Sequence, residues 1–277
     1  MMSLADKGGE MVEATGRIVC APRHLPRQEW PKAATNAIAV NPGNRPPGLE
    51  EDEVPMGSDG EKLAIDVTRY WGKKGVHLTV GFFDTPDQAL RKRILLHLNA
   101  WGKNANVVFV ESATEPKVRI ARRTASEAGP GGDGYWSNLG TDVLLIDSRK
   151  PTMNLEAFTM QTADSEFYRV VRHEAGHTLG FPHEHMRKAI VERLDREKVI
   201  RAYMESQGWT RQEVIDQVLT PLEESSLLGT PMAEADSIMC YEISGKLTLD
   251  GKPVVGGTDI TAHDHAFAAQ IYPKPSK

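Results

Sequence analysis

The chain of 277 residues lacks several features that mark common protein classes. It has only two cysteines, Cys20 and Cys240, and two cysteines so far apart do not form a disulfide framework. No stretch approaches the roughly 18 consecutive apolar residues that cross a bilayer, so we expect no membrane span. The first 20 residues lack a continuous apolar run and show no evident signal peptide, so we expect a cytoplasmic location or export by a non-classical route.

Basic charge is also scarce. The chain has 33 Lys and Arg against 38 Asp and Glu, a net charge of -5, and no basic cluster. Domains that bind nucleic acid usually carry a basic patch, so we do not expect nucleic acid as a partner. The hydrophobic content of 40% is ordinary for a soluble globular protein.

Residues 173–183, HEAGHTLGFPH, have the pattern H-E-x-x-H-x-x-G-x-x-H, which is typical of a zinc site with its own general base. Residues four apart on a helix lie on one face, so His173 and His177 can direct their imidazoles at one ion. Glu174 lies about 100° further round the helix axis. This position suits a base that acts on a metal-activated water better than it suits a ligand.

We predict a helix over residues 165–179, capped by Asp164 or Ser165, because apolar residues recur there at helical spacing. Gly180 should end this helix, since glycine adopts the left-handed conformation without penalty.

The turn after the helix should bring His183 back to the metal as a third ligand. His185 is an alternative third ligand, two residues out of register with the pattern. Three imidazoles leave one position open, which is typical of a catalytic zinc site rather than a structural one.

With Phe181, Glu184 and Arg187, the sequence resembles the astacin family of the metzincin clan, whose string is H-E-x-x-H-x-x-G-F-x-H-E-x-x-R. Residues 237–241, SIMCY, resemble the astacin Met-turn, S-x-M-x-Y. The resemblance implies that Met239 forms an apolar floor beneath the metal. It also implies that Tyr241 is a switchable zinc ligand that swings to stabilise the transition-state oxyanion.

Weaker similarity extends over about residues 61–273. Residues 133–140 resemble the strand that lines the top of the astacin cleft, and residues 261–272 resemble the closing helix and its tail. The chain departs from the family by lacking two disulfides and by having Cys240 where His is usual. In astacins the Glu that follows the third His binds the freed N-terminus, whereas here roughly sixty residues precede the domain.

The remaining pattern predicts an α+β fold, with a sheet-rich part followed by helices and loops. The resemblance implies that this fold is a metzincin-like catalytic domain with a mixed twisted sheet and a C-terminal helical and loop subdomain. We expect strands at residues 76–82, 107–110, 118–121 and 143–146. We expect a helix that starts at Thr85 with a capping box and a proline, and it should present one apolar stripe. Further helices are expected over residues 195–206 and from a cap at Thr210 to Pro221.

Residues 1–60 hold seven of the 17 prolines and should be extended, with residues 61–277 forming the catalytic domain. The extension is either a flexible tail or a pro-segment that lies in the cleft. Its Cys20 could place a thiolate on the zinc or form a disulfide with Cys240.

These features predict a zinc-dependent endopeptidase with one catalytic Zn²⁺ and a protein or peptide as substrate. His173, His177 and His183 would bind the metal, together with Tyr241, and Glu174 would act as general base. The alternatives are an inactive metzincin-like binding module, a zinc hydrolase of a non-peptide substrate, and a purely structural zinc site.

Overall fold

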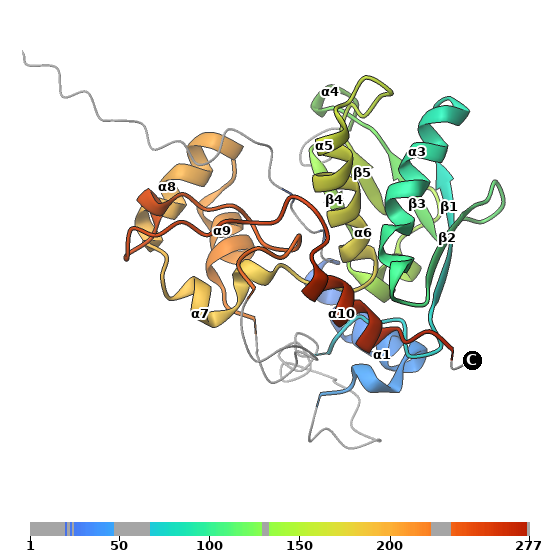
Figure 1. Ribbon diagram of the computed structural model, residues 1–277, viewed down its shortest axis with the longest axis horizontal. Coiled ribbons are helices and arrows are strands. Elements are labelled where there is room, and N and C mark those ends of the chain that lie inside the picture. Colours follow the sequence, from blue (N-terminus) through green and yellow to red (C-terminus); the bar gives the residue numbers. More distant parts are fainter. Residues whose placement is uncertain are drawn as a thin grey trace, which may run out of the picture.

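The structure is a computed structural model that describes residues 20, 23, 25–46, 67–128, 133–222 and 234–275. It has two lobes. One is a sheet with helices packed on it, and the other holds shorter helices and loops (Figure 1). The sheet order is β2-β1-β3-β5-β4. The strands are β1 (Val76–Phe82), β2 (Val107–Glu111), β3 (Val118–Ala121), β4 (Tyr135–Ser137) and β5 (Met153–Leu155).

All neighbouring strands are parallel except β4, which runs antiparallel to β5 at one edge of the sheet. This mixed sheet and its helices confirm the predicted α+β fold. Alternate residues of β1, namely Val76, Leu78 and Val80, are buried, which is why this segment reads as a strand in the sequence.

The predicted zinc helix is confirmed as one continuous stretch. It comprises α5 (Asp164–Glu166), a π-helical turn (Phe167–Val171) and α6 (Arg172–Thr178). The predicted side-chain cap is wrong, because Ala163 occupies the N-cap and no side chain bonds there. Gly180 ends the helix as predicted, with φ of 95°. A Cβ at Gly180 would lie 2.9 Å from the Arg69 carbonyl oxygen, so the close approach also requires glycine.

Helix α3 (Gln88–Leu98) begins later than predicted. Its N-cap is Asp87, whose carboxylate accepts from the Leu90 N–H at 2.8 Å, and not Thr85. The apolar stripe is confirmed, since Leu90, Ile94 and Leu98 are buried and a 3₁₀ turn (Asn99–Lys103) carries the stripe on to Trp101. A short helix α4 (Ala125–Ala128) follows β3.

The strand predicted at residues 143–146 is wrong, because a 3₁₀ helix (Gly140–Leu145) occupies this region. Gly140 has φ of 46°, and the N–H of Thr141 donates to the Arg69 carbonyl at 3.0 Å. A buried ion pair joins Arg69 to Asp142 at 2.8 Å. These contacts with a distant segment fold the chain into a tight turn.

The extension is not wholly extended, and this prediction is wrong for helix α1 (Trp30–Val40), which follows a 3₁₀ turn (Arg27–Glu29). After a second 3₁₀ turn (Pro42–Asn44), the buried Asn44 side chain donates to the Tyr70 carbonyl at 2.8 Å and accepts from the Tyr70 N–H at 3.0 Å. This amide therefore pairs with the backbone of the main domain as a strand would.

The second lobe follows the zinc helix. It contains a 3₁₀ turn (Glu184–Met186), α7 (Lys188–Val191), α8 (Arg196–Gln207), α9 (Arg211–Val214) with a π turn (Ile215–Leu219), and a 3₁₀ turn (Gly245–Leu247). Helix α10 (Ala262–Ile271) lies between the lobes in Figure 1. The helix predicted over residues 195–206 is confirmed, with Asp195 as its N-cap, and the predicted cap at Thr210 is also confirmed. Each cap side chain accepts a hydrogen bond from the first turn of its helix.

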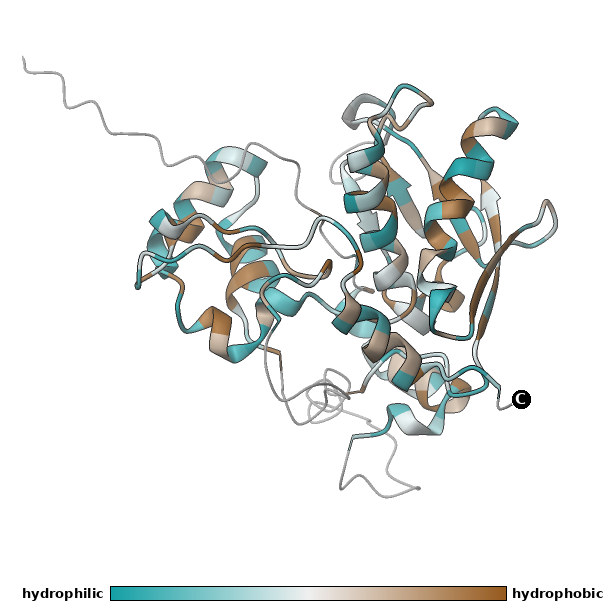
Figure 2. Cartoon of the chain, viewed as in Figure 1, coloured by the Kyte–Doolittle hydropathy of each residue, from teal (hydrophilic) through white to brown (hydrophobic). Residues whose placement is uncertain are grey.

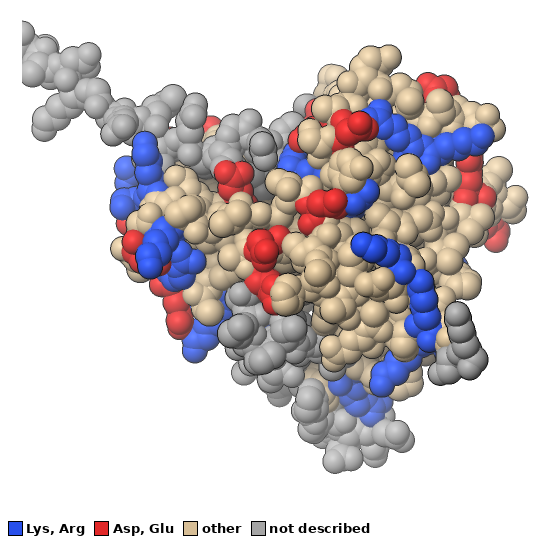
Figure 3. Space-filling view, viewed as in Figure 1, with Lys and Arg blue, Asp and Glu red and all other residues tan. Residues whose placement is uncertain are grey.

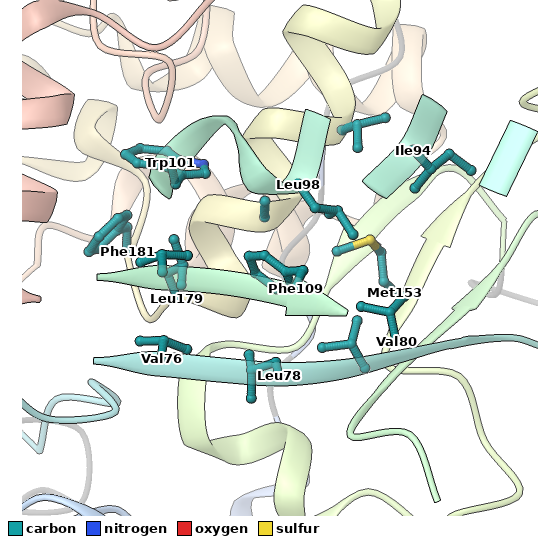
Figure 4. Packing of buried hydrophobic residues seen from close by; sticks show 14 of the residues in the cluster. Val76, Leu78, Val80, Ile94, Leu98, Trp101, Phe109, Met153, Leu179 and Phe181 are labelled. Carbon is teal, nitrogen blue, oxygen red and sulfur yellow. The ribbon is translucent and has the colours of Figure 1, made fainter. Parts of the chain in front are cut away.

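Each lobe packs around its own cluster of buried apolar residues. In the sheet lobe, Trp101 lies against Phe181, with 5.1 Å between ring centroids, beside the inner face of β1 and β2 (Figure 4). In the other lobe, Val199 and Val218 are fully buried. Hydrophobic residues concentrate along the strands and the inner faces of the helices (Figure 2). The active-site helix therefore belongs to the first core, and the residues after it lead to the second.

Acidic and basic side chains are interspersed over the face of the molecule shown in Figure 3. Within the described residues, no helix is both long enough and apolar enough to span a membrane.

Candidate active site

Three histidine side chains converge where the zinc helix meets the chain after it. Nε2 of His183 lies 3.2 Å from Nε2 of His173 and 3.0 Å from Nε2 of His177. All three residues are buried. The turn at Gly180 places His183 opposite the helical pair, as the spacing predicts.

Backbone carbonyls hold two of these rings in one tautomer. Nδ1 of His173 lies 2.6 Å from the Ile238 oxygen, and Nδ1 of His177 lies 2.8 Å from the Phe181 oxygen. A carbonyl can only accept, so each Nδ1 carries a proton and each Nε2 presents a lone pair. Burial lowers the pKa of His173 to about 4, so its imidazole is neutral at pH 7.

This arrangement fits a single zinc ion. Two lone pairs face His183 Nε2, which can donate to only one of them, so a cation satisfies the group better than hydrogen bonds do. Zinc binds imidazole nitrogens at about 2.0–2.1 Å in tetrahedral geometry, which separates ligand nitrogens by about 3.3 Å. The observed spacings are close to that value.

Glu174 lies beside the histidines and is fully buried. Apart from the adjacent Cys20 thiol, neither of its carboxylate oxygens has a hydrogen-bonding neighbour in the described part of the chain. Burial raises the pKa of Glu174 to about 8, while the Cys20 thiol and the Arg169 charge lower it. A buried carboxyl without a fixed partner can exchange a proton with a bound molecule.

Cys20 lies inside the same group. Its sulfur and one nitrogen from each of the three histidines all lie within 4.8 Å of one another. Burial and the neighbouring Glu174 raise the pKa of its thiol. Both Cys20 and Cys240 are free thiols, so the alternative of a disulfide between them is wrong.

Tyr241 lies over this group. Its ring centroid is 4.3 Å from that of His183, and its hydroxyl donates to the Cys20 carbonyl. His185, the alternative third ligand, does not join the cluster. It stacks on Tyr241 at 3.9 Å between ring centroids, and its Nε2 lies 3.1 Å from the Gln217 carbonyl. His185 is thus a neighbour of Tyr241.

Met239 packs against the zinc helix at Gly176. A Cβ at Gly176 would lie only 2.4 Å from the Met239 sulfur, so the glycine makes room for the methionine. The turn itself is closed by the Cys240 N–H, which donates to the Ser237 carbonyl at 2.9 Å.

A buried carboxylate from helix α10 anchors that turn. Asp264 accepts from the Ser237 hydroxyl at 2.6 Å and from the Ile238 N–H at 3.0 Å. Since the Ile238 carbonyl accepts from His173, Asp264 positions the first histidine through a single residue, Ile238. The sequence indicated only a family-like helix here. Ser237 and Ile238 lie 27 and 26 residues from Asp264 in the chain, too far for spacing to reveal these contacts.

Glu184, which follows the third histidine, accepts from the Glu234 N–H at 3.2 Å. Burial raises its pKa to about 7. With the extension in place, Glu184 therefore has a backbone N–H as its partner.

The N-terminal extension reaches the edge strand beside the site. The Arg23 N–H donates to the Ser137 carbonyl at 3.0 Å, forming an isolated parallel bridge with Asn138. The Ser137 hydroxyl lies 2.9 Å from the Thr178 hydroxyl, one residue after His177. Residues 135–138 thus connect the edge of the sheet to the zinc helix.

The fold places the chain among the zinc metalloendopeptidases, and comparisons with known proteins support this class. The chain matches no protein-family model. A structure of myroilysin is 30% identical, with a TM-score of 0.67 over 75% of this chain and 97% of that one. A second myroilysin structure is 28% identical, with a TM-score of 0.55 over 85% of this chain and 97% of that one.

A zinc metalloproteinase of Caenorhabditis elegans, nas-27, is 30% identical over 98 residues, which are 35% of this chain and 19% of that protein. The chain thus spans about a fifth of the length of this curated relative. On the whole-domain similarity to myroilysin, the chain belongs to the astacin-like metzincins.

Proposed function

We propose that this protein is an endopeptidase that cleaves extended protein segments, with His173, His177 and His183 holding one catalytic zinc ion. The observation that carries the proposal is the convergence of three imidazole nitrogens beside a buried carboxyl, Glu174. When bound, the zinc ion supplies a Lewis acid that polarises the scissile carbonyl and makes water more acidic. Residues 61–277 would form the catalytic domain.

Glu174 is assigned as the general base. Its carboxylate would take the proton of the attacking water and pass it to the nitrogen of the leaving amine. The absence of a fixed hydrogen-bond partner in the described residues, other than the Cys20 thiol, supports this role.

Tyr241 is assigned to the oxyanion. Its hydroxyl donates to a main-chain carbonyl, that of Cys20, and a substrate carbonyl at the same place would receive the same bond. Its role as a metal ligand remains part of the proposal. The substrate would pair its backbone with β4, whose outer edge pairs with Arg23 here.

We also infer that the N-terminal extension keeps the enzyme latent. Cys20 places its thiol among the histidines and its carbonyl on the Tyr241 hydroxyl, so one residue engages both groups. A thiolate is a good zinc ligand, and its binding would fill the open position. This favours a pro-segment over a flexible tail.

The experiment uses the full-length chain loaded with zinc. Casein hydrolysis is measured for the wild type, for Cys20→Ala and for Cys20→Ala with Glu174→Ala, each with and without a chelator, and zinc content is determined for all three. We expect Cys20→Ala to cleave casein faster than the wild type. Adding Glu174→Ala should retain zinc and lower the rate roughly 10²–10⁴-fold.

Cobalt substitution gives an independent readout of latency. A thiolate bound to Co²⁺ produces a charge-transfer absorption, which should be present in the wild type and absent in Cys20→Ala. Undiminished cleavage by the Glu174 variant would refute the base assignment, and identical cobalt spectra would refute the thiol plug. If none of the three proteins shows cleavage that a chelator abolishes, the result would favour a binding module.

A further inference from the structure

Arg23 of the N-terminal extension is held on the edge strand by both its backbone and its side chain. Its guanidinium carbon lies 3.8 Å from the centroid of the Trp136 ring, well inside the roughly 6 Å range of a cation–π contact. Its N–H donates to the Ser137 carbonyl at 3.0 Å, and the side-chain amide of Asn138 donates to the Arg23 carbonyl at 3.1 Å. The strand therefore binds Arg23 as it would bind a residue of an extended peptide.

The surface beneath Arg23 suits a positive charge. The side chain is partly buried, which lowers the pKa of its guanidinium, and the negative charge of Asp133 acts in the opposite direction. Asp133 lies two residues before β4, and Trp136 lies within it. A flat aromatic face with a carboxylate nearby is a combination that binds planar cations.

This surface is fixed relative to the three histidines. Trp136 pairs with Asn154 of β5 in the antiparallel ladder and is 3% exposed. The next residue, Ser137, is hydrogen-bonded to Thr178 of the zinc helix. A side chain that packs on the Trp136 ring therefore lies at a fixed distance from the three histidines.

We propose that Trp136 and Asp133 form a substrate subsite that selects a cationic side chain, and that Arg23 fills this subsite in the present structure. The inference rests on the proposed function, because it requires substrate to pair with β4. Arg23 is three residues from Cys20, whose thiol lies among the histidines. A preferred substrate therefore carries Arg, and less favourably Lys, about three residues from the cleaved bond.

The test compares two fluorogenic peptides that differ only in Arg or citrulline at that position. Citrulline keeps the shape and planarity of arginine and removes its charge. The enzyme is the full-length chain with Cys20→Ala and Arg23→Ala, so that neither the thiol nor the guanidinium competes. Peptide pairs with the variable residue on either side of the cleaved bond identify the side that binds. We expect kcat/KM to favour Arg roughly 3- to 30-fold.

Two further substitutions locate the preference. Asp133→Asn and Trp136→Phe, each added separately, should reduce the Arg-to-citrulline ratio. Glu205→Gln, an equivalent change at an exposed position of α8, should leave the ratio unaltered. Asp133 is only partly buried, so its variant keeps the test decisive if Trp136→Phe fails to fold.

Binding separates this inference from the proposed function. With Glu174→Gln added, fluorescence anisotropy measures the Kd of both peptides without cleavage. Equal cleavage and equal binding of the two peptides would overturn the subsite and leave the endopeptidase standing. Tighter binding of the Arg peptide without cleavage by any variant would support the subsite and reject the endopeptidase. If neither peptide is bound or cleaved, both fail.

Discussion

The Ile238 carbonyl oxygen lies 2.6 Å from Nδ1 of His173, although 65 residues separate the two in the chain. This hydrogen bond fixes the tautomer of a proposed zinc ligand through a backbone group of the Met-turn. The orientation of the first histidine therefore depends on how firmly that turn is anchored. The anchor is the Asp264 carboxylate, which accepts from the Ser237 hydroxyl and the Ile238 N–H.

Replacing Asp264 should loosen the turn and weaken metal binding together. Asp264→Ala leaves the Ile238 and Thr261 N–H groups without their carboxylate acceptor, so we expect the free energy of unfolding to fall by about 2–4 kcal/mol. Zinc affinity should fall roughly 10- to 100-fold, as for other partners behind a ligand. Urea denaturation and competition with a chromogenic chelator measure the two effects. Asp216→Ala, an exposed control, should change stability by less than about 0.5 kcal/mol.

Removing a histidine of the cluster should remove the metal. In the Cys20→Ala background, which removes the proposed thiolate ligand, His177→Ala is expected to retain little zinc after dialysis against a weak chelator, because two imidazoles bind zinc far less tightly than three. Elemental analysis provides the measurement, and His77→Ala, which changes an exposed histidine, should keep one zinc per chain. Full zinc occupancy in the His177 variant would contradict the ligand assignment.

The contact between Gly176 and Met239 predicts that Gly176→Ala has opposite effects on stability with and without the Met239 side chain. An alanine at 176 gains about 1 kcal/mol of helix propensity. Its Cβ would lie 2.4 Å from the Met239 sulfur, and such overpacking costs about 1–3 kcal/mol.

We therefore expect Gly176→Ala to destabilise the wild type and to stabilise a Met239→Ala background. The free energies of unfolding from denaturant titrations form a double-mutant cycle. Equal effects in both backgrounds would show that the two side chains do not compete for space.

His97 should make stability depend on pH. Burial and the charges of Arg172 and Arg93 lower its pKa from 6.5 to about 4. The unfolded chain then binds the proton more readily, so stability falls as pH drops from about 6.5 to about 4, by at most about 1.4 kcal/mol per pH unit.

A variant that cannot titrate isolates this contribution. The stability advantage of the wild type over His97→Gln should shrink between pH 7 and pH 5 in urea titrations. A difference that stays constant would show that His97 titrates alike in both states.

The candidate site could be predicted because its residues lie close together in the sequence. Helical spacing alone pairs His173 with His177, and a glycine at 180 dictates where the helix must end. The same local rules located β1, α8 and the cap at Thr210. In each case the neighbouring residues decide the conformation.

The predictions from sequence were wrong where contacts between distant residues decide the conformation. Residues 143–146 have the composition of a strand, but the Arg69 carbonyl and the Arg69–Asp142 ion pair draw this region into a tight turn. The prolines around helix α1 led us to predict an extended segment. The helix forms because its alanines, including Ala34 and Ala37, pack against Val67. Neither contact can be predicted from the spacing of neighbouring residues.

The separation of the buried cores has a consequence for how the molecule would respond to losing its ion. Residues around His173 and His177 pack in the sheet-side core, whereas Tyr241 packs in the other core. If the ion binds Tyr241 as proposed, it would connect two separately packed parts of the molecule. Removing the ion should then leave both cores folded and increase the movement of one lobe relative to the other.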